Sequence, residues 1–145
     1  MPENSASREP VSDLLVFDTS IFLDHLRASR HEQRLRGVSG LVRTSAVVLA
    51  EMWRGATKPA EREFLRTLAR NHPILTPTEN NWLESGQILS VISADRGTPP
   101  GKLRDLHFDV LIALTARSHG ARLITSNRRD FELIHEYRKF QLDIW

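Results

Sequence analysis

The stretch LLVFDTSIFLDHL, residues 14–26, places an aspartate where an apolar run gives way to polar residues. The four apolar residues before Asp18 are typical of a short strand that is buried on both faces. From Thr19 onward, apolar residues recur on one face of a helix. Asp18 is therefore either the N-cap of that helix, a role that aspartate often fills, or a group kept for chemistry.

The composition is that of an ordinary globular chain. It has 145 residues, of which 40% are hydrophobic and 26% are charged. The chain contains no cysteine, so it has neither a disulfide framework nor a thiolate metal site. No apolar run approaches the roughly 18 residues that a membrane span requires. Residues 1–12 are polar and lack a signal sequence, so we expect a flexible lead-in, one domain over 13–145, no membrane partner and a cytoplasmic location.

The basic residues are compatible with a nucleic-acid partner but do not require one. The net charge is only +2, but 17 of the 20 basic residues are arginine. The planar guanidinium matches phosphate oxygens well, although a GC-rich genome also produces an excess of arginine. Lys58, Arg62, Arg66 and Arg70 form a basic stripe on one helix. Such a stripe either follows an RNA backbone or simply faces water.

Apolar runs and helical patterns alternate along the chain. We expect strands at 14–18, 41–45, 73–77, 121–126 and 140–145, and helices at 19–27, 46–54, 58–70, 80–94 and 106–119. The segment RGTPPGK, residues 96–102, is expected to be a loop. This alternation predicts an α/β fold in which helices cover both faces of a mainly parallel sheet. Ligands of such folds bind at the carboxyl ends of the strands, where Asp18 lies.

Two further acidic residues lie in apolar surroundings. Glu51 is flanked by apolar residues in SAVVLAEMWRG (45–55), and Asp109 interrupts the apolar helix HFDVLIALTA (107–116). Three partly buried carboxylates that meet at one edge of the sheet repel one another unless a cation joins them. Oxygen ligands favour Mg²⁺ or Mn²⁺. The three acids therefore predict a divalent metal site.

Each acid also has a structural alternative. Glu51 can pair with Arg54 or another arginine, and Asp109 can pair with Arg104 or lie near the start of its helix. Asp105, one turn before Asp109, is either an outer acid of the same site or a helix cap. Each acid is a weak signal alone. The order of the acids and the elements on which they lie make the set specific.

Three motifs together resemble the PIN-domain ribonucleases, and most closely the VapC toxins of bacterial VapBC toxin–antitoxin pairs. They span residues 14–134 in the family's order and are FDTSIFLDHLR (17–27), SAVVLAEMWRGA (45–56) and FDVLIALTARSHGARLITSNRRDF (108–131). The resemblance implies a PIN-like three-layer α/β/α fold with a central, mainly parallel sheet. It also implies that Asp18, Glu51 and Asp109 are catalytic and coordinate one or two Mg²⁺ or Mn²⁺ ions.

The chain departs from the family pattern at one position. A fourth acid often follows two residues after the threonine of the LIT strand, and Asn127 stands there in this chain. An amide oxygen still binds a metal ion or a water molecule but carries no charge. Asp130 either substitutes for the missing acid, as a catalytic group and metal ligand, or orients the loop. Ser20 is expected near the metal or the scissile phosphate, with helix capping as the alternative, and Arg128 and Arg129 are expected to bind RNA.

The residues and the resemblance together predict a Mg²⁺- or Mn²⁺-dependent endoribonuclease that cleaves tRNA or ribosomal RNA, the toxin of a type II toxin–antitoxin system. The resemblance also implies a homodimer and a VapB-like antitoxin that covers the acidic site in a toxin–antitoxin hetero-oligomer. The main alternative, motivated by Asn127, is a PIN-like RNA- or protein-binding module that cleaves nothing. A phosphorylation receiver domain fits less well, because no lysine lies between Lys102 and Lys139.

Overall fold

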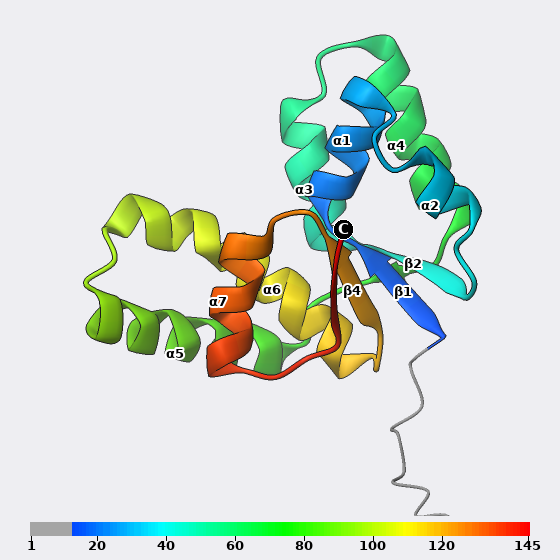
Figure 1. Ribbon diagram of the computed structural model, residues 1–145. Helices are drawn as coiled ribbons and strands as arrows, with labels where there is room; N and C mark the ends of the chain where they lie inside the picture. Colours follow the sequence, from blue (N-terminus) through cyan, green and yellow to red (C-terminus); the bar gives the residue numbers. More distant parts are fainter. Residues whose placement is uncertain (1–12) are drawn as a thin grey trace, which may run out of the picture.

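Five parallel strands form the centre of the protein (Figure 1). The computed structural model describes residues 13–145, so the lead-in expected over 1–12 lies outside the described residues. The sheet has the order β3-β2-β1-β4-β5, which places the opening strand of the chain in the middle. The strands are β1 (Leu14–Phe17), β2 (Leu41–Ser45), β3 (Ile74–Leu75), β4 (Arg122–Thr125) and β5 (Leu142–Ile144).

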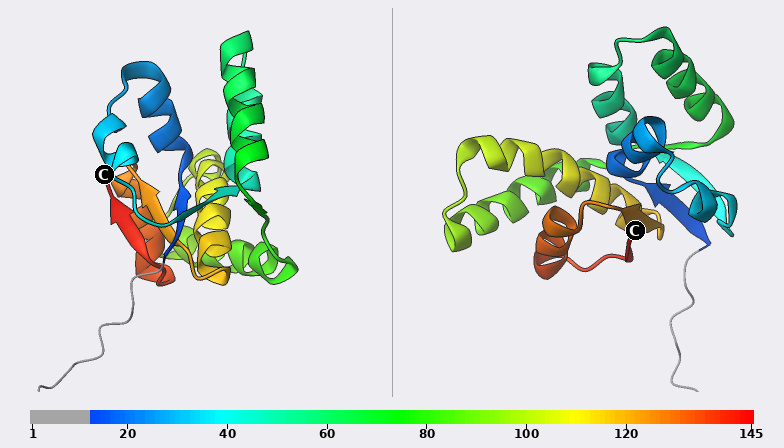
Figure 2. Two further views of the ribbon diagram at one scale, coloured as in Figure 1. Left: turned by 90° about the vertical axis from the view of Figure 1, so that its right-hand side faces the viewer. Right: turned by 45° about the horizontal axis from the view of Figure 1, so that its top comes forward.

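Seven helices, counted over residues 13–145, surround this sheet in two groups. Helices α5, α6 and α7 lie on one side of the sheet, and α1 to α4 lie on the other side and above the carboxyl ends of the strands (Figures 1 and 2). The predicted α/β/α architecture with a parallel sheet is confirmed. The helices are α1 (Thr19–Ala28), α2 (Glu32–Arg36), α3 (Ala46–Gly55), α4 (Pro59–Asn71), α5 (Glu79–Arg96), α6 (Pro100–Ser118) and α7 (Arg128–Tyr137).

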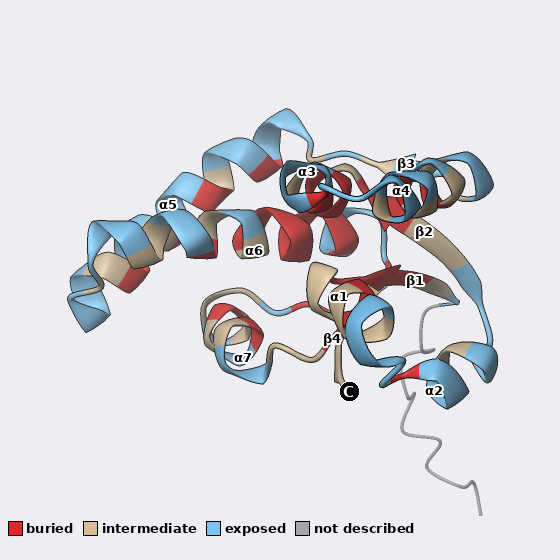
Figure 3. Cartoon of the chain, turned by 90° about the horizontal axis from the view of Figure 1, so that it is seen from above, coloured by how far each residue is buried: buried red, intermediate tan, exposed pale blue. Residues whose placement is uncertain are grey.

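Strand β1 and helix α6 form the core. Leu15 and Val16, whose side chains point to opposite faces of the sheet, are both 1% exposed, as a continuous apolar run in a central strand requires. In α6, every residue from Val110 to Ala116 is buried (Figure 3). Because α6 packs against strands, α5 and α7 at once, it needs apolar residues on more than one face. An acid within such a helix is therefore held where water is scarce.

The expected loop at 96–102 and the expected helix start at 106 were wrong, and two helices were missed. Helix α6 begins at Pro100, six residues before the predicted start, so the expected loop over 96–102 shrinks to a short turn. Proline suits the first turn of a helix because its missing N–H has no partner there and its φ angle is already helical. Helices α2 and α7 were not predicted. No helix in the described part of the chain is long and apolar enough to cross a membrane.

Candidate metal centre

Asp18 is both a helix cap and a buried carboxylate. Its backbone N–H extends the sheet by donating to the carbonyl oxygen of Ile124 at 2.9 Å. Its φ and ψ angles of −69° and 158° are extended, and its carboxylate accepts a hydrogen bond from the N–H of Ser20 at 3.4 Å. Asp18 is only 3% exposed, whereas a cap of a surface helix usually faces water. Burial raises the pKa of Asp18, against the opposing effect of its hydrogen bonds.

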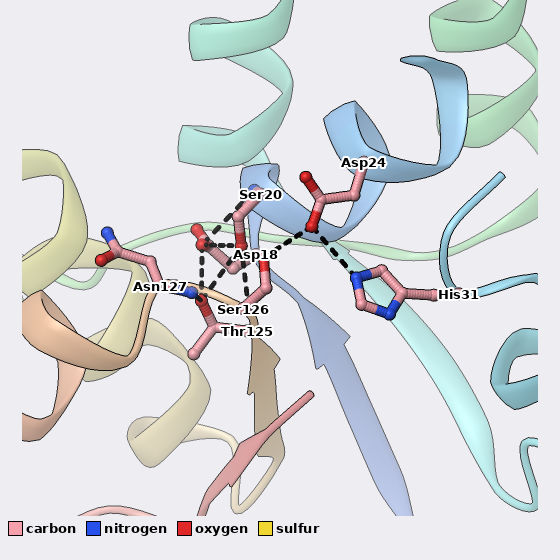
Figure 4. A network of polar contacts seen from close by, with 7 residues as sticks. All are labelled: Asp18, Ser20, Asp24, His31, Thr125, Ser126 and Asn127. Carbon is pink, nitrogen blue, oxygen red and sulfur yellow. Dashed lines mark hydrogen bonds and ion pairs between the residues drawn. The ribbon is translucent and has the colours of Figure 1, made fainter. Parts of the chain in front are cut away.

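Two hydroxyl groups hold the Asp18 carboxylate in place (Figure 4). Ser20 and Thr125 donate to the same oxygen, Oδ2, at 2.7 and 2.8 Å. The backbone N–H groups of Ser126 and Asn127 in turn donate to these hydroxyl oxygens at 3.1 and 2.9 Å. We call this arrangement the hydroxyl clasp. It leaves Oδ1 without a hydroxyl donor among the described residues.

Glu51 lies on α3, above the end of β2. The hydroxyl of Ser45 caps α3, and the hydroxyl of Thr19 donates to Glu51 Oε1 at 3.3 Å. Burial, and then the charge of Asp18, raise the pKa of Glu51, while the charge of Arg54 opposes the shift. In residues 13–145, Glu51 forms no ion pair with Arg54, so the alternative of a simple surface pair is not observed.

Asp109 lies halfway along α6, far from either end of the helix. Burial raises the pKa of Asp109 to about 8, and the nearby charges of Asp18, Glu51 and Asp130 add to the shift. Within the described chain it has no ion pair with Arg104 that would explain an acid at this position. Neither structural alternative for Asp109 is therefore observed.

The three acids face one cavity of about 280 Å³. They come from the end of β1, from α3 and from α6, three elements that are distant in sequence. The cavity is lined by Asp18, Thr19, Ser20, Leu23, Glu51, Arg54, Asp105, Phe108, Asp109 and Asn127. Burial raises the pKa of all three carboxyl groups, and acidic neighbours add to the rise at Glu51 and Asp109, which is the situation that a bound cation relieves.

The residues of this acid cavity fit a hard divalent cation. Carboxylate and amide oxygens are the donors that Mg²⁺ and Mn²⁺ prefer. Over residues 13–145, no three acidic or histidine side chains lie close enough to enclose a metal ion by themselves. An ion bound in this cavity would therefore take water or substrate oxygens as ligands beside the carboxylates, as Mg²⁺ commonly does.

Asn127 lines the acid cavity, but Asp130 does not. The Asn127 side chain caps α7 by accepting from the N–H of Asp130 at 3.4 Å and donates through Nδ2 to the Asp130 carboxylate at 3.2 Å. Lys102 Nζ donates to both carboxylate oxygens of Asp130, at 2.9 and 3.0 Å. Asp130 thus connects α7 to the first turn of α6, and this contact orients Asn127 at the rim of the acid cavity.

The other predicted site residues are distributed around the acid cavity. Ser20 lies in its wall, as part of the hydroxyl clasp. Arg128 forms an exposed ion pair with Glu132 at 2.7 Å, and Arg129 lines a neighbouring hollow of about 490 Å³. Arg54 was not predicted to contact RNA, yet it lines the acid cavity itself with its guanidinium carbon 5.5 Å from the centre of the Phe108 ring. Its position one turn after Glu51 was the available signal.

Thr125 was also missed as a site residue. It is fully buried at the end of β4, which pairs with β1 so that Phe17 lies opposite Ile124. Strand pairing therefore brings Thr125 beside Asp18, and a hydroxyl at the end of the LIT run was the signal.

The basic stripe on α4 faces solvent and is partly neutralised. Arg66 and Arg70 both lie within ion-pair distance of Glu63, at 3.5 and 3.6 Å, and all three side chains are more than half exposed. Such surface pairs contribute little to stability. The stripe is thus a solvated helix face and not part of the acid cavity.

The fold and the acids can be compared with known proteins. Residues 15–136 match the family model described as PIN domain. No curated protein matches the chain. Because the matched segment extends from β1 into α7, it includes all three acids of the cavity and Asn127.

Several solved structures share the fold. A structure of VapBC-1 from nontypeable Haemophilus influenzae is 23% identical, with a TM-score of 0.68, over 91% of this chain and 98% of that one. A DNA-bound VapBC from Salmonella typhimurium is 24% identical, with a TM-score of 0.64, over 93% and 98%. A toxin–antitoxin complex from Klebsiella pneumoniae is 23% identical, with a TM-score of 0.56, over 81% and 89%. At these identities the likeness shows a common fold.

Proposed function

We propose, because this chain belongs to the PIN domain family, that it is a divalent-metal-dependent endoribonuclease and the toxin of a toxin–antitoxin pair. The observation that carries this proposal is the convergence of Asp18, Glu51 and Asp109 on one cavity, each with a raised pKa. The fold shared with VapBC structures supports the toxin role. The proposed substrates are tRNA or ribosomal RNA, met in the cytoplasm.

The residues of the acid cavity would divide the work of hydrolysis. Asp18, Glu51 and Asp109 would hold Mg²⁺ or Mn²⁺, and Asn127 would contribute a neutral oxygen. A bound ion supplies Lewis-acid activation of water and of the phosphodiester. The hydroxyl clasp keeps Asp18 in one orientation, which spares the cost of ordering this carboxylate during catalysis. Arg54, at the mouth of the cavity, would contact a phosphate oxygen of the RNA.

The first test is metal-dependent cleavage. Purified protein free of any partner is expected to cut RNA at discrete positions in Mg²⁺ or Mn²⁺, and EDTA is expected to stop the reaction, because the carboxylates alone cannot activate water. The products are resolved on a denaturing gel. Restored cutting after excess Mg²⁺ is added back separates loss of the ion from loss of the protein.

The alternative function is a PIN-like module that binds RNA or protein without cutting it. The amide at Asn127 favours it, because this position removes one negative charge from the metal centre. RNA that stays intact in both ions, in the presence of protein that binds it, would favour the binding module and contradict the nuclease.

A groove next to the acid cavity fits the proposed antitoxin. Its volume is about 690 Å³, and it lies between α1, α3 and α4. Thr19, Leu23 and Glu51 line both spaces, so a segment in the groove would end at the acids. The groove is lined by Thr19, Leu23, Leu26, Arg27, Glu51, Met52, Gly55, Ala56, Lys58, Ala60, Glu61 and Leu65. An amphipathic antitoxin segment that carries a basic residue at its end would fit this lining. We also propose that the toxin forms a homodimer.

The groove can be tested through Leu26, which is 41% exposed and can be changed without disturbing the core. Leu26→Glu is expected to weaken copurification with the product of a short adjacent reading frame by about tenfold or more, because it places a charge in an apolar contact. RNA cleavage by the free protein should change little. Leu83→Glu on α5, at 63% exposure, is the matched control and should copurify like the wild type. Equal copurification of both variants would place the antitoxin elsewhere.

A further inference from the structure

A second pocket lies beside the acid cavity at the carboxyl edge of the sheet. Its volume is about 470 Å³. It is formed by the end of α1, by the start of α2 and by the residues that follow β4 and β5. We call it the arginine pocket, and it is lined by Asp24, Arg30, His31, Arg34, Ser126 and Trp145. None of these residues lines the acid cavity.

The arginine pocket and the metal centre share a wall (Figure 4). The backbone N–H of Ser126 donates to Ser20 Oγ at 3.1 Å, and Ser20 holds Asp18. On the pocket side, the Ser126 hydroxyl donates to Asp24 Oδ2 at 2.9 Å. Ser126 therefore lies between the two spaces, and only two hydrogen bonds separate it from Asp18.

The arginine pocket carries an excess of positive charge. Arg30 and Arg34 are both exposed at its rim, and neither forms an ion pair with a carboxylate of residues 13–145. Asp24 is the single acid in the lining. Its carboxylate is already engaged, because it also contacts His31 Nε2 at 3.1 Å. The arginine and aspartate side chains of the lining together carry a charge of +1, which one phosphodiester group neutralises.

An aromatic surface completes the arginine pocket. The Arg34 guanidinium carbon lies 5.6 Å from the centre of the Trp145 ring, and the His31 ring lies 5.6 Å from the same ring. The Phe17 ring, at the end of β1, packs against Trp145 from the core, with the two ring centres 5.6 Å apart. A positively charged groove beside a fixed aromatic ring is the combination that binds single-stranded RNA, with phosphates on the cations and bases on the rings.

We propose that the arginine pocket binds a phosphodiester of single-stranded RNA next to the one that is cleaved, with Arg30 and Arg34 on the phosphate and Trp145 beside its base. This inference rests on the proposed function, because it assigns the direction in which the RNA leaves the acid cavity. It also gives a role to two arginines without an ion pair beside an acidic site, where their charge offsets the repulsion between carboxylates and RNA.

The proposal is tested by RNA binding without cleavage. A labelled single-stranded oligoribonucleotide is titrated in Mg²⁺ against Asp109→Asn protein, with and without Arg34→Gln, and followed by fluorescence anisotropy. Arg34→Gln is expected to raise Kd about tenfold, because a hydrogen bond to a charged phosphate is lost. The slope of log Kd against log salt should fall by about 0.7, the value for one phosphate contact on a single strand. Arg30→Gln is expected to act in the same direction.

Arg36→Gln is the matched control. Arg36 lies on α2 like Arg34, is exposed, and pairs with Glu32 outside the arginine pocket. The substitution therefore removes the same charge without changing the pocket. Its Kd should stay within about twofold of the parent protein. Equal affinities of the Arg34→Gln and Arg36→Gln proteins would overturn the proposal. So would a loss of antitoxin binding by Arg34→Gln with unchanged RNA affinity, since the pocket would then serve a protein partner.

This experiment separates the subsite from the nuclease. If Arg34→Gln weakens RNA binding but no metal ion supports cleavage by the wild type, the arginine pocket stands and the nuclease proposal fails. If the wild type cleaves RNA and Arg34→Gln binds it normally, the nuclease stands and the arginine pocket fails. As a second readout, Arg34→Gln should lower kcat/KM on long RNA but not on a dinucleotide, which is too short to occupy both spaces.

Discussion

Replacing Asp18 by asparagine is expected to lower RNA cleavage by at least about a hundredfold while leaving the fold intact. Asparagine caps a helix about as well as aspartate does, and its amide oxygen can accept the hydroxyls of Ser20 and Thr125. The variant therefore removes the charge and keeps the cap. Initial rates on RNA in Mg²⁺, together with thermal unfolding in EDTA, measure the two properties separately.

Two further variants control this result. Asp18→Ala removes the cap as well as the charge and should unfold at a lower temperature, with a loss of about 1 kcal/mol or more. Asp105→Asn changes an exposed acid at the rim of the same cavity and should lower the rate about tenfold at most. Asp18→Asn protein that cleaves RNA at the wild-type rate would reduce Asp18 to a helix cap.

The stability of the metal-free protein is expected to fall as the pH rises from about 4 to about 8. Asp109 has a pKa of about 8 in the folded protein and an ordinary value of 3.8 when unfolded, so between these values the folded state keeps a proton that the unfolded state has lost. The free energy of unfolding decreases wherever the folded state binds more protons. The raised pKa values of Asp18 and Glu51 act in the same direction. Thermal unfolding in EDTA across this range measures the slope.

Asp109→Asn should flatten this slope and make the metal-free protein more stable than the wild type at pH 8, by on the order of a few kcal/mol. In Mg²⁺ the wild type should become the more stable of the two proteins, because the ion binds the ionised wild type more tightly than it binds the variant. Asp105→Asn, an exposed change one turn earlier, should follow the wild-type curve. A wild-type unfolding temperature that rises towards pH 8 in EDTA would contradict the assignment of Asp109 as a partly buried acid with other acids close by.

Local pattern was sufficient to predict the elements that carry the three acids. The apolar run before Asp18 predicted β1, and the LVRTS run predicted β2 with the bounds observed, 41–45. Acids in apolar surroundings predicted Glu51 and Asp109 as members of one cavity, which the structure shows. These signals are strong because burying an unpaired carboxylate is costly, so such residues are rare without a reason.

Contacts between distant segments were beyond the sequence. Asp130 was a candidate ligand, but Lys102, 28 residues away, holds its carboxylate outside the acid cavity. The arginine pocket brings Arg34 against Trp145, and no periodicity relates these two residues. The helix from Pro100 was missed because a Pro–Pro–Gly run usually marks a turn, whereas here the second proline begins a helix that tertiary packing supports.

The hydroxyl clasp has a consequence for how the protein is made. Asp18 and Thr125 are 107 residues apart, so the clasp closes only after β4 has left the ribosome and paired with β1. A nascent chain that has reached the end of α5 carries Asp18 and Glu51 but neither Asp109 nor Thr125. Parallel pairing of distant strands is also a slow step in folding. The acid cavity is thus completed only when synthesis of the chain is nearly finished.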